Sequence, residues 1–200
     1  REACGGSGYL TKNRFTSLYQ DLDVYATFEG DNHILLQLVA KRLLGDYSKE
    51  FAGLDFGTIT KYVSSRAEDL AVNRTGLRRA AQIIQDTGGS KKSAQALKDP
   101  KIQRDLLGDR VHTLISEAAD ALRPARKMRP EDATKLFNSQ QVKLIDAARS
   151  HAELLQWEAM TEAVGTMEGK TAEVMTSLRD LFGLTLIEQN LGWYLSLIHI

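Results

Sequence analysis

The sequence has little of several features that would place a protein in a specialised class. Cys4 is the one cysteine among 200 residues, so an internal disulfide is excluded and a reducing compartment is the default. The 26 basic and 26 acidic side chains balance, which argues against nucleic-acid binding through bulk positive charge. No apolar run approaches the roughly 20 residues that cross a bilayer, so we expect no membrane span.

Histidine is also scarce, and the two ends of the chain are unusual. The four histidines are scattered and none belongs to a ligand-spaced cluster, so no metal site is expected. The chain opens on Arg1 without methionine or a signal peptide, and we expect it to begin inside a longer protein. Residues 195–200 resemble the translated end of a transposon adapter used in DNA sequencing libraries. We expect these six residues to be an artefact, the alternative being an ordinary apolar helix end.

What the sequence does contain is apolar side chains at helical spacing. No stretch alternates with a period of two, so the sequence predicts an all-α fold without a sheet. We expect helices over residues 13–25, 34–46, 59–71, 77–84, 99–122, 131–167 and 174–186. Asn13, Asp31 and Asn32 are candidate caps, and Asp99-Pro100 is a typical helix start. Residues 51–57 are expected to be a linker, and residues 88–93 form the clearest loop.

Two motifs near the beginning of the chain carry candidate chemistry. Ala3-Cys4-Gly5-Gly6-Ser7-Gly8-Tyr9 is a glycine-rich turn, and Thr27-Phe28-Glu29-Gly30-Asp31-Asn32 places a carboxylate at the entrance to a helix. A glycine pair lets the backbone approach a ligand closely, and a helix start offers free N–H groups. Taken alone, a short glycine motif is most often a plain turn, and a glutamate before a helix most often complements the helix dipole.

In this order, and with Asp21-Leu22-Asp23-Val24-Tyr25 between them, the motifs resemble the flavin-binding helical domain of acyl-CoA oxidases and acyl-CoA dehydrogenases, the oxidase branch in particular. Ser7 departs from the histidine often seen in that family, and His33 from the usual threonine. Residues 1–50 would be the end of that domain. Residues 51–194 resemble, less specifically, the second helical domain of oxidase-like members. The resemblance therefore implies a C-terminal fragment made of two helical domains, followed by the suspected artefact.

The resemblance implies FAD-dependent α,β-dehydrogenation of a fatty acyl-CoA to a trans-2-enoyl-CoA, a step of fatty acid β-oxidation. Glu29 matches the base that takes the proton beside the thioester carbonyl, while a hydride passes to the flavin. Such a base must be well positioned and poorly solvated, since burial makes a carboxylate more basic. Gly30 would let the substrate approach the backbone. In the family, the backbone N–H of the base and a flavin hydroxyl hold the carbonyl oxygen.

The same resemblance implies the cofactor contacts and the assembly. Residues matching Glu2, Ala3, Cys4, Gly5 and Gly6 contact the adenosine part of a neighbouring subunit's FAD, and residues matching Asp31, Asn32 and His33 border the cofactor. A homodimer or homotetramer is therefore expected.

Several alternatives stay open within and beyond the family. Oxygen would accept the electrons in an oxidase, and an electron-transfer flavoprotein in a dehydrogenase. A non-catalytic helical interaction domain could use the same scaffold. The 200 residues alone are expected to be inactive and to bind FAD poorly, because the β-domain that holds the flavin ring in the family is absent. The expected location is the bacterial cytoplasm, or the peroxisome in a eukaryote.

Overall fold

The computed structural model describes residues 1–52 and 95–196, and within them every regular element is a helix, which confirms the all-α expectation. The first part contains the 3₁₀ helices η1 (Glu2–Tyr9) and η2 (Thr11–Asn13), then α1 (Phe15–Asp23), η3 (Val24–Ala26) and α2 (Asn32–Ala52). The second contains α5 (Pro100–Leu122), η4 (Arg123–Lys127), α6 (Pro130–Ser139), α7 (Gln141–Gly165), α8 (Gly169–Gln189) and α9 (Leu191–Ser196). The expected helices over 59–71 and 77–84 and the loop over 88–93 lie outside the described residues.

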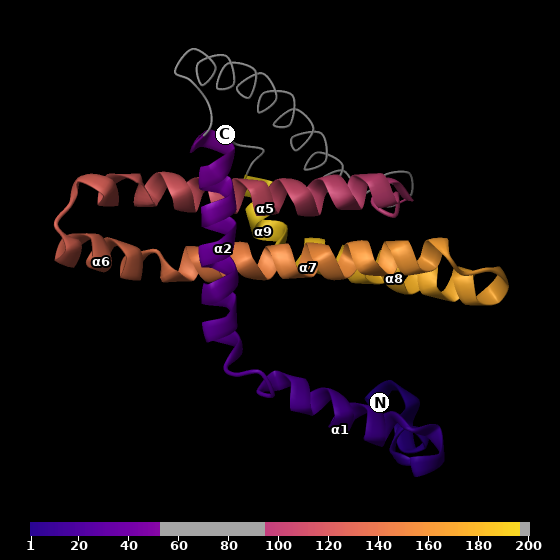
Figure 1. The fold of residues 1–200 in the computed structure, drawn as a ribbon. Coiled ribbons are helices and arrows are strands. Elements are labelled where there is room, and N and C mark those ends of the chain that lie inside the picture. Colours follow the sequence, from indigo (N-terminus) through magenta and orange to yellow (C-terminus); the bar gives the residue numbers. More distant parts are fainter. Residues whose placement is uncertain (53–94, 197–200) are drawn as a thin grey trace.

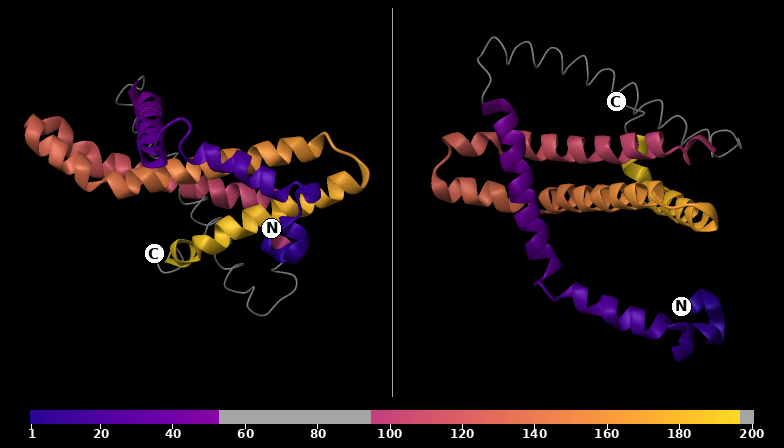
Figure 2. Two further views of the ribbon diagram at one scale, coloured as in Figure 1. Left: turned by 90° about the horizontal axis from the view of Figure 1, so that it is seen from below. Right: turned by 45° about the vertical axis from the view of Figure 1, so that its right-hand side comes forward.

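Among the described residues, four long helices form a bundle from which a shorter arm extends. Helices α5 and α7 run side by side in opposite directions, and α2 crosses both of them (Figure 1). Helix α8 folds back along α7. The arm consists of η1, η2, α1 and η3, which pack mainly on one another and lie away from the bundle (Figure 2). Helix α2 joins arm and bundle, and it runs through the domain boundary that the sequence predicts at residue 50.

In the described part of the chain, the bundle core contains three apolar clusters, each at a place where three helices meet. Small side chains let α2 cross α5 and α7 closely, whereas large ones fill the two clusters around α8. The buried members are Ala40, Ala118, Leu144 and Ala148 between α2, α5 and α7; Leu107, Trp157 and Leu186 between α5, α7 and α8; and Leu97, Leu106, Ile187 and Tyr194 around α5, α8 and α9. Burying one large side chain of this kind stabilises a fold by about 1.5 to 3 kcal/mol.

Helix starts agree with the sequence in some places and differ in others. Asp99 Oδ1 accepts the N–H of Lys101 at 2.8 Å, which confirms the expected start at Asp99-Pro100. Asn13 does not cap α1, because its Nδ2 donates instead to the carbonyl oxygen of Ser7 at 2.8 Å. The N-cap position of α1 is occupied by Arg14, whose φ is 59°.

Two helices end at places that the sequence pattern does not predict. Helix α2 continues past Gly45 to Ala52, because tertiary contacts outweigh the poor helix propensity of one glycine. One such contact joins Tyr47 Oη and Ser116 Oγ at 3.3 Å. The single helix expected over residues 131–167 is in fact α6 and α7, which are separated at Gln140 (φ −97°, ψ 3°).

The apolar residues that the sequence predicts to face the core are only partly buried in α7, and in the first half of α8 they are exposed. Leu144 and Ala148 are buried in α7 as expected, but Leu155 is 50% exposed. In α8, the expected core residues Val174, Leu178 and Leu181 are 58%, 47% and 60% exposed. The side chains buried in α8 include Arg179 and Leu186. Helical spacing identifies residues that share a face, but it does not tell which face a neighbouring helix covers.

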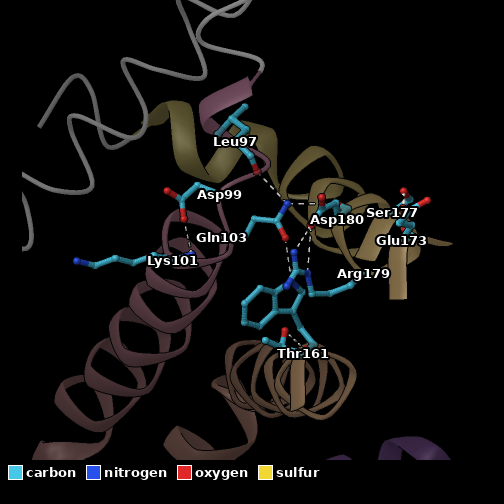
Figure 3. A network of polar contacts seen from close by, with 10 residues as sticks. Leu97, Asp99, Lys101, Gln103, Thr161, Glu173, Ser177, Arg179 and Asp180 are labelled. Carbon is cyan, nitrogen blue, oxygen red and sulfur yellow. Dashed lines mark hydrogen bonds and ion pairs between the residues drawn. The ribbon is translucent and has the colours of Figure 1, made fainter. Parts of the chain in front are cut away.

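A buried polar network lies beside the apolar cluster where α5, α7 and α8 meet (Figure 3). Gln103 Oε1 accepts the indole N–H of Trp157 at 2.9 Å, and Gln103 Nε2 donates to the carbonyl oxygen of Leu97 at 2.8 Å. Both side chains are essentially inaccessible to solvent. A Cβ on Gly183 would collide with Gln103 Oε1 and lie 2.8 Å from Trp157 Nε1, so the network requires glycine there.

The same network extends to a buried ion pair on α8. Arg179 Nη2 lies 2.6 Å from the carboxylate oxygen Oδ1 of Asp180, and the Arg179 guanidinium lies 5.8 Å from the centre of the Trp157 ring. The charge is therefore paired and stacked, which is what a buried guanidinium requires. Neither Gln103 nor Arg179 is suggested as a core residue by the hydrophobic pattern.

Candidate active site

Glu29 lies in a tight turn between η3 and α2. The N–H of Phe28 donates to the carbonyl oxygen of Val24 at 2.9 Å, and the N–H of Gly30 donates to that of Thr27 at 3.0 Å. Gly30 has a φ of 119°, which side chains with a Cβ rarely adopt, so the turn needs glycine at this position. The turn leaves the Glu29 side chain exposed, and no described residue pairs with its carboxylate.

The backbone N–H of Glu29 is also without a partner among the described residues. A turn that presents a carboxylate and a free N–H from one residue can offer a base and a hydrogen-bond donor to the same ligand. Among residues 1–52 and 95–196, nothing gives Glu29 the poorly solvated surroundings expected of the base. Any such surroundings must come from atoms other than those of the described residues.

Asp31 caps the helix that follows the turn. Its Oδ1 accepts the N–H of His33 at 2.8 Å and that of Ile34 at 3.4 Å, which confirms Asp31 as a cap of α2. The imidazole Nδ1 of His33 lies 3.5 Å from the same oxygen. These two helix-start N–H groups are therefore already satisfied within the chain. The parts of Asp31, Asn32 and His33 that stay open to a ligand are their exposed side chains.

The glycine-rich turn forms η1 and exposes one backbone surface. Gly5 has a φ of 53°, and neither it nor Gly6 has an atom within 4 Å of the place where a Cβ would be. Glu2, Ala3 and Cys4 are exposed beside them. A flat ligand could thus approach this backbone without displacing a side chain, which is the property expected of a glycine pair at a cofactor site.

The opposite side of that turn is closed by Arg1. A Cβ on Gly8 would collide with the carbonyl oxygen of Arg1, and the same oxygen accepts the N–H of Cys4 at 3.1 Å. The Arg1 guanidinium lies 4.6 Å from the centre of the Tyr9 ring and 5.1 Å from that of Tyr19. We refer to Arg1 with these two rings as the Arg1 cage.

The glycine-rich turn and the Glu29 turn lie at opposite ends of α1 (Figure 1). Nine helical residues span about 14 Å, so one chain does not bring the two motifs into a single pocket. Instead, they lie along one arm whose apolar side chains are largely uncovered. The most exposed large ones are Tyr25 (72%), Phe28 (71%) and Leu22 (67%). An apolar surface of this extent marks a site of interaction.

A second group of titratable residues, which the sequence pattern did not indicate, lies between α5, α7 and α9. Burial, reinforced by the nearby Asp105, raises the pKa of Asp109 to about 6. Burial also raises the pKa of Glu153, and the positive charge of Arg110 partly opposes that shift. Arg110 Nη2 donates to Asn190 Oδ1 at 2.6 Å.

The described residues hold no group of three His, Cys, Asp or Glu side chains arranged to bind a metal ion. Across residues 1–52 and 95–196, each helix is too short or too polar to cross a membrane.

Two family models match the chain. The model described as the acyl-CoA oxidase C-alpha1 domain matches residues 1–44, the arm and the first turns of α2. The model described as acyl-CoA oxidase matches residues 99–199, from the cap of α5 onward. The first match includes both motifs, and the second covers half of the chain.

Individual relatives agree with these family models. The chain is 34% identical over 195 residues to the peroxisomal acyl-coenzyme A oxidase 2 of Arabidopsis thaliana, covering 97% of this chain and 26% of that protein. It is 58% identical over 45 residues to the human peroxisomal acyl-coenzyme A oxidase 3, covering 22% of this chain and 6% of that protein. The crystal structure of acyl-CoA oxidase 3 from Yarrowia lipolytica superposes with a TM-score of 0.65 at 24% identity, over all of this chain and 26% of that one. The chain thus spans about a quarter of the length of the Arabidopsis and Yarrowia proteins.

Proposed function

The chain belongs to the acyl-CoA oxidase family, and from this premise we propose that it is the part of a fatty acyl-CoA oxidase that carries the catalytic base. The reaction is α,β-dehydrogenation of a fatty acyl-CoA to a trans-2-enoyl-CoA. The Glu29 turn is the observation that carries the proposal. It presents a carboxylate and a backbone N–H from one residue, both without a partner among the described residues, just before the start of α2.

In this proposal Glu29 takes the proton from the carbon next to the thioester carbonyl. Its own N–H donates to the carbonyl oxygen and stabilises the negative charge that develops there. FAD, when bound, supplies the acceptor for the hydride that leaves the next carbon. Gly30 keeps the side of the turn next to the base free of a side chain, and nothing lies within 4 Å of its missing Cβ. Asp31 fixes the direction of α2, and so the position of the turn, by capping the helix.

The residues proposed to contact FAD form two groups at the two ends of α1. The open backbone of Gly5 and Gly6 suits the adenosine part of the cofactor, and residues 2–4 flank it. The side chains of Asp31, Asn32 and His33 lie beside Glu29, where they would border the flavin part. One chain keeps these groups apart, which supports the expectation that each cofactor is shared by two subunits of a homodimer or homotetramer.

Two alternative functions differ from the proposed oxidase, one in its electron acceptor and the other in having no catalytic activity. An acyl-CoA dehydrogenase that passes electrons to an electron-transfer flavoprotein would use the same base, and a helical interaction domain would use none. The oxidase is favoured because the relatives that cover most of this chain are named oxidases. A peroxisomal location is proposed if the source is eukaryotic, since two of the relatives are named peroxisomal, and the bacterial cytoplasm otherwise. The 200 residues alone are expected to be inactive and to bind FAD poorly.

The test uses the complete protein that contains this segment. The purified parent is mixed without oxygen with a series of acyl-CoAs, and flavin absorbance is followed alongside Glu29→Gln. We expect bleaching in the parent and a loss of about 10²- to 10⁴-fold in the rate for the variant, because an amide cannot act as the base. Admitting oxygen and assaying peroxide then separates oxidase from dehydrogenase. Equal bleaching in both proteins would exclude Glu29 as the base. A parent protein that carries no flavin would leave the non-catalytic helical interaction domain as the remaining interpretation.

A further inference from the structure

The Arg1 cage holds the glycine-rich turn at both of its ends. The Arg1 carbonyl oxygen accepts the N–H of Cys4 near the start of the turn and packs directly on Gly8 near its end. The Arg1 guanidinium lies between the ring of Tyr9, the last residue of η1, and that of Tyr19 in the middle of α1. One residue therefore ties the turn to itself and to the helix behind it.

A turn with glycine at three of eight positions needs such a constraint. Glycine loses more conformational freedom on ordering than any other residue, so a free turn of this composition would populate many shapes. Besides the backbone hydrogen bonds of η1 itself, the carbonyl oxygen of Ser7 near the far end of the turn accepts hydrogen bonds from Leu10 N–H and Asn13 Nδ2. At Gly5 and Gly6, the surface proposed to face the cofactor, no atom lies within 4 Å of the place where a Cβ would be.

We propose that Arg1 is a positioning residue of the cofactor site, one that acts through the Tyr9 and Tyr19 rings to hold residues 2–6 in the shape that binds FAD. This inference rests on the proposed function. Arg1 acts on the backbone of the turn and stands at the other end of α1 from Glu29, so it affects cofactor affinity and leaves the chemical step unchanged. If the turn is ordered for only part of the time, the apparent dissociation constant of the ligand equals the intrinsic constant divided by the ordered fraction. A less ordered turn therefore binds its ligand more weakly.

The test measures the dissociation constant of FAD from the complete apoprotein by flavin fluorescence. Arg1→Met keeps the length of the side chain without its charge, and Tyr19→Leu removes one ring of the cage. An exposed cation–π pair corresponds to a roughly two- to fivefold rise in the dissociation constant for either variant. The double variant should show the same rise as Arg1→Met alone, because Arg1→Met already removes both cation–π contacts, including the one that Tyr19→Leu removes. Arg1→Lys and Tyr19→Phe keep a cation and a ring and should remain close to the parent.

Three further measurements distinguish this role from others. Arg126→Met, at an exposed arginine of η4, controls for the loss of a surface charge and should bind FAD as the parent does. The melting temperature of the apoprotein and the rate of flavin reduction at saturating FAD should be unchanged in Arg1→Met. A lowered melting temperature or a slower reduction would overturn the assignment, because either would show a role beyond cofactor affinity.

The outcomes also separate this inference from the proposal on which it rests. A parent that binds FAD, together with an unchanged constant in Arg1→Met, would reject the inference alone. Weaker binding in Arg1→Met but not in Tyr19→Leu would also reject it, since it would indicate a direct contact between Arg1 and the cofactor. A parent that binds no FAD would reject the proposed function and the inference together.

Discussion

Gly183 offers the sharpest test of how the bundle is packed, because the same substitution should have opposite effects at two glycines. Gly183→Ala places a methyl group against Gln103 and Trp157 in the buried network. Gly108 is also inside a helix, α5, but nothing lies within 4 Å of its missing Cβ. Gly108→Ala should therefore show the gain in helix propensity alone.

The expected magnitudes follow from these surroundings. Overpacking costs about 1 to 3 kcal/mol. Displacing Gln103 from the Trp157 indole N–H leaves a buried donor unsatisfied, which costs about 1 to 3 kcal/mol more. The better helix propensity of alanine offsets about 1 kcal/mol of this loss in stability. We expect Gly183→Ala to lower the free energy of unfolding by about 3 kcal/mol, and Gly108→Ala to raise it by about 1 kcal/mol.

Urea unfolding of the chain, followed by far-ultraviolet circular dichroism, measures both values. Trp157→Phe removes the indole N–H, so adding Gly183→Ala to that variant should cost less than adding it to the parent. Equal stability of Gly183→Ala and Gly108→Ala would refute the reasoning, because the close approach of α8 to α5 and α7 would then be absent.

Two further predictions concern charged groups. Asp109 has a folded-state pKa of about 6 against an ordinary value of 3.8, so ionisation opposes folding, and the loss of stability develops as the pH rises through that interval. Asp109→Asn should therefore match the parent below pH 4 and exceed it by about 1 kcal/mol above pH 6, a value reduced for the partial exposure of the carboxyl group; urea unfolding at both pH values checks this, and a variant that gains stability only in acid would contradict it. Asp31→Ala removes the α2 cap and should cost about 1 kcal/mol, whereas Asp31→Asn should cost less; amide hydrogen exchange of residues 33–36 measures the effect, and equal protection in both variants would contradict the cap.

The parts of the fold that could be predicted from the sequence are those governed by local chemistry. Asp31 and Asp99-Pro100 mark helix starts because capping depends on residues a few positions apart. The break between α6 and α7 at Gln140 has no glycine or proline, so the local sequence did not predict it. The buried Gln103 was equally hidden, because its partners Leu97 and Trp157 come together only when three helices pack.

The candidate site shows the same division. The residue types and their order pointed to Glu29 and the glycine pair, and the structure shows them as an exposed turn and an open backbone surface. The sequence could not indicate how Glu29 would be shielded from water, since the apolar arm around it is exposed in the part of the chain that the structure describes. It also gave no sign of the Arg1 cage, which depends on the fold of η1 against α1.

The position of the Glu29 turn depends, through helix α2, on the packing around Ala40 in the bundle. Ala40 is fixed between α5 and α7, and the helix begins eight residues earlier at Asn32, a lever arm of about 12 Å. A tilt of about 5° at Ala40 would carry the start of the helix through about 1 Å. Errors of that size in the position of a catalytic group can slow a reaction about 10²-fold. Substitutions where Ala40 crosses α5 and α7 should therefore impair the proposed dehydrogenation even with every residue of the candidate site intact.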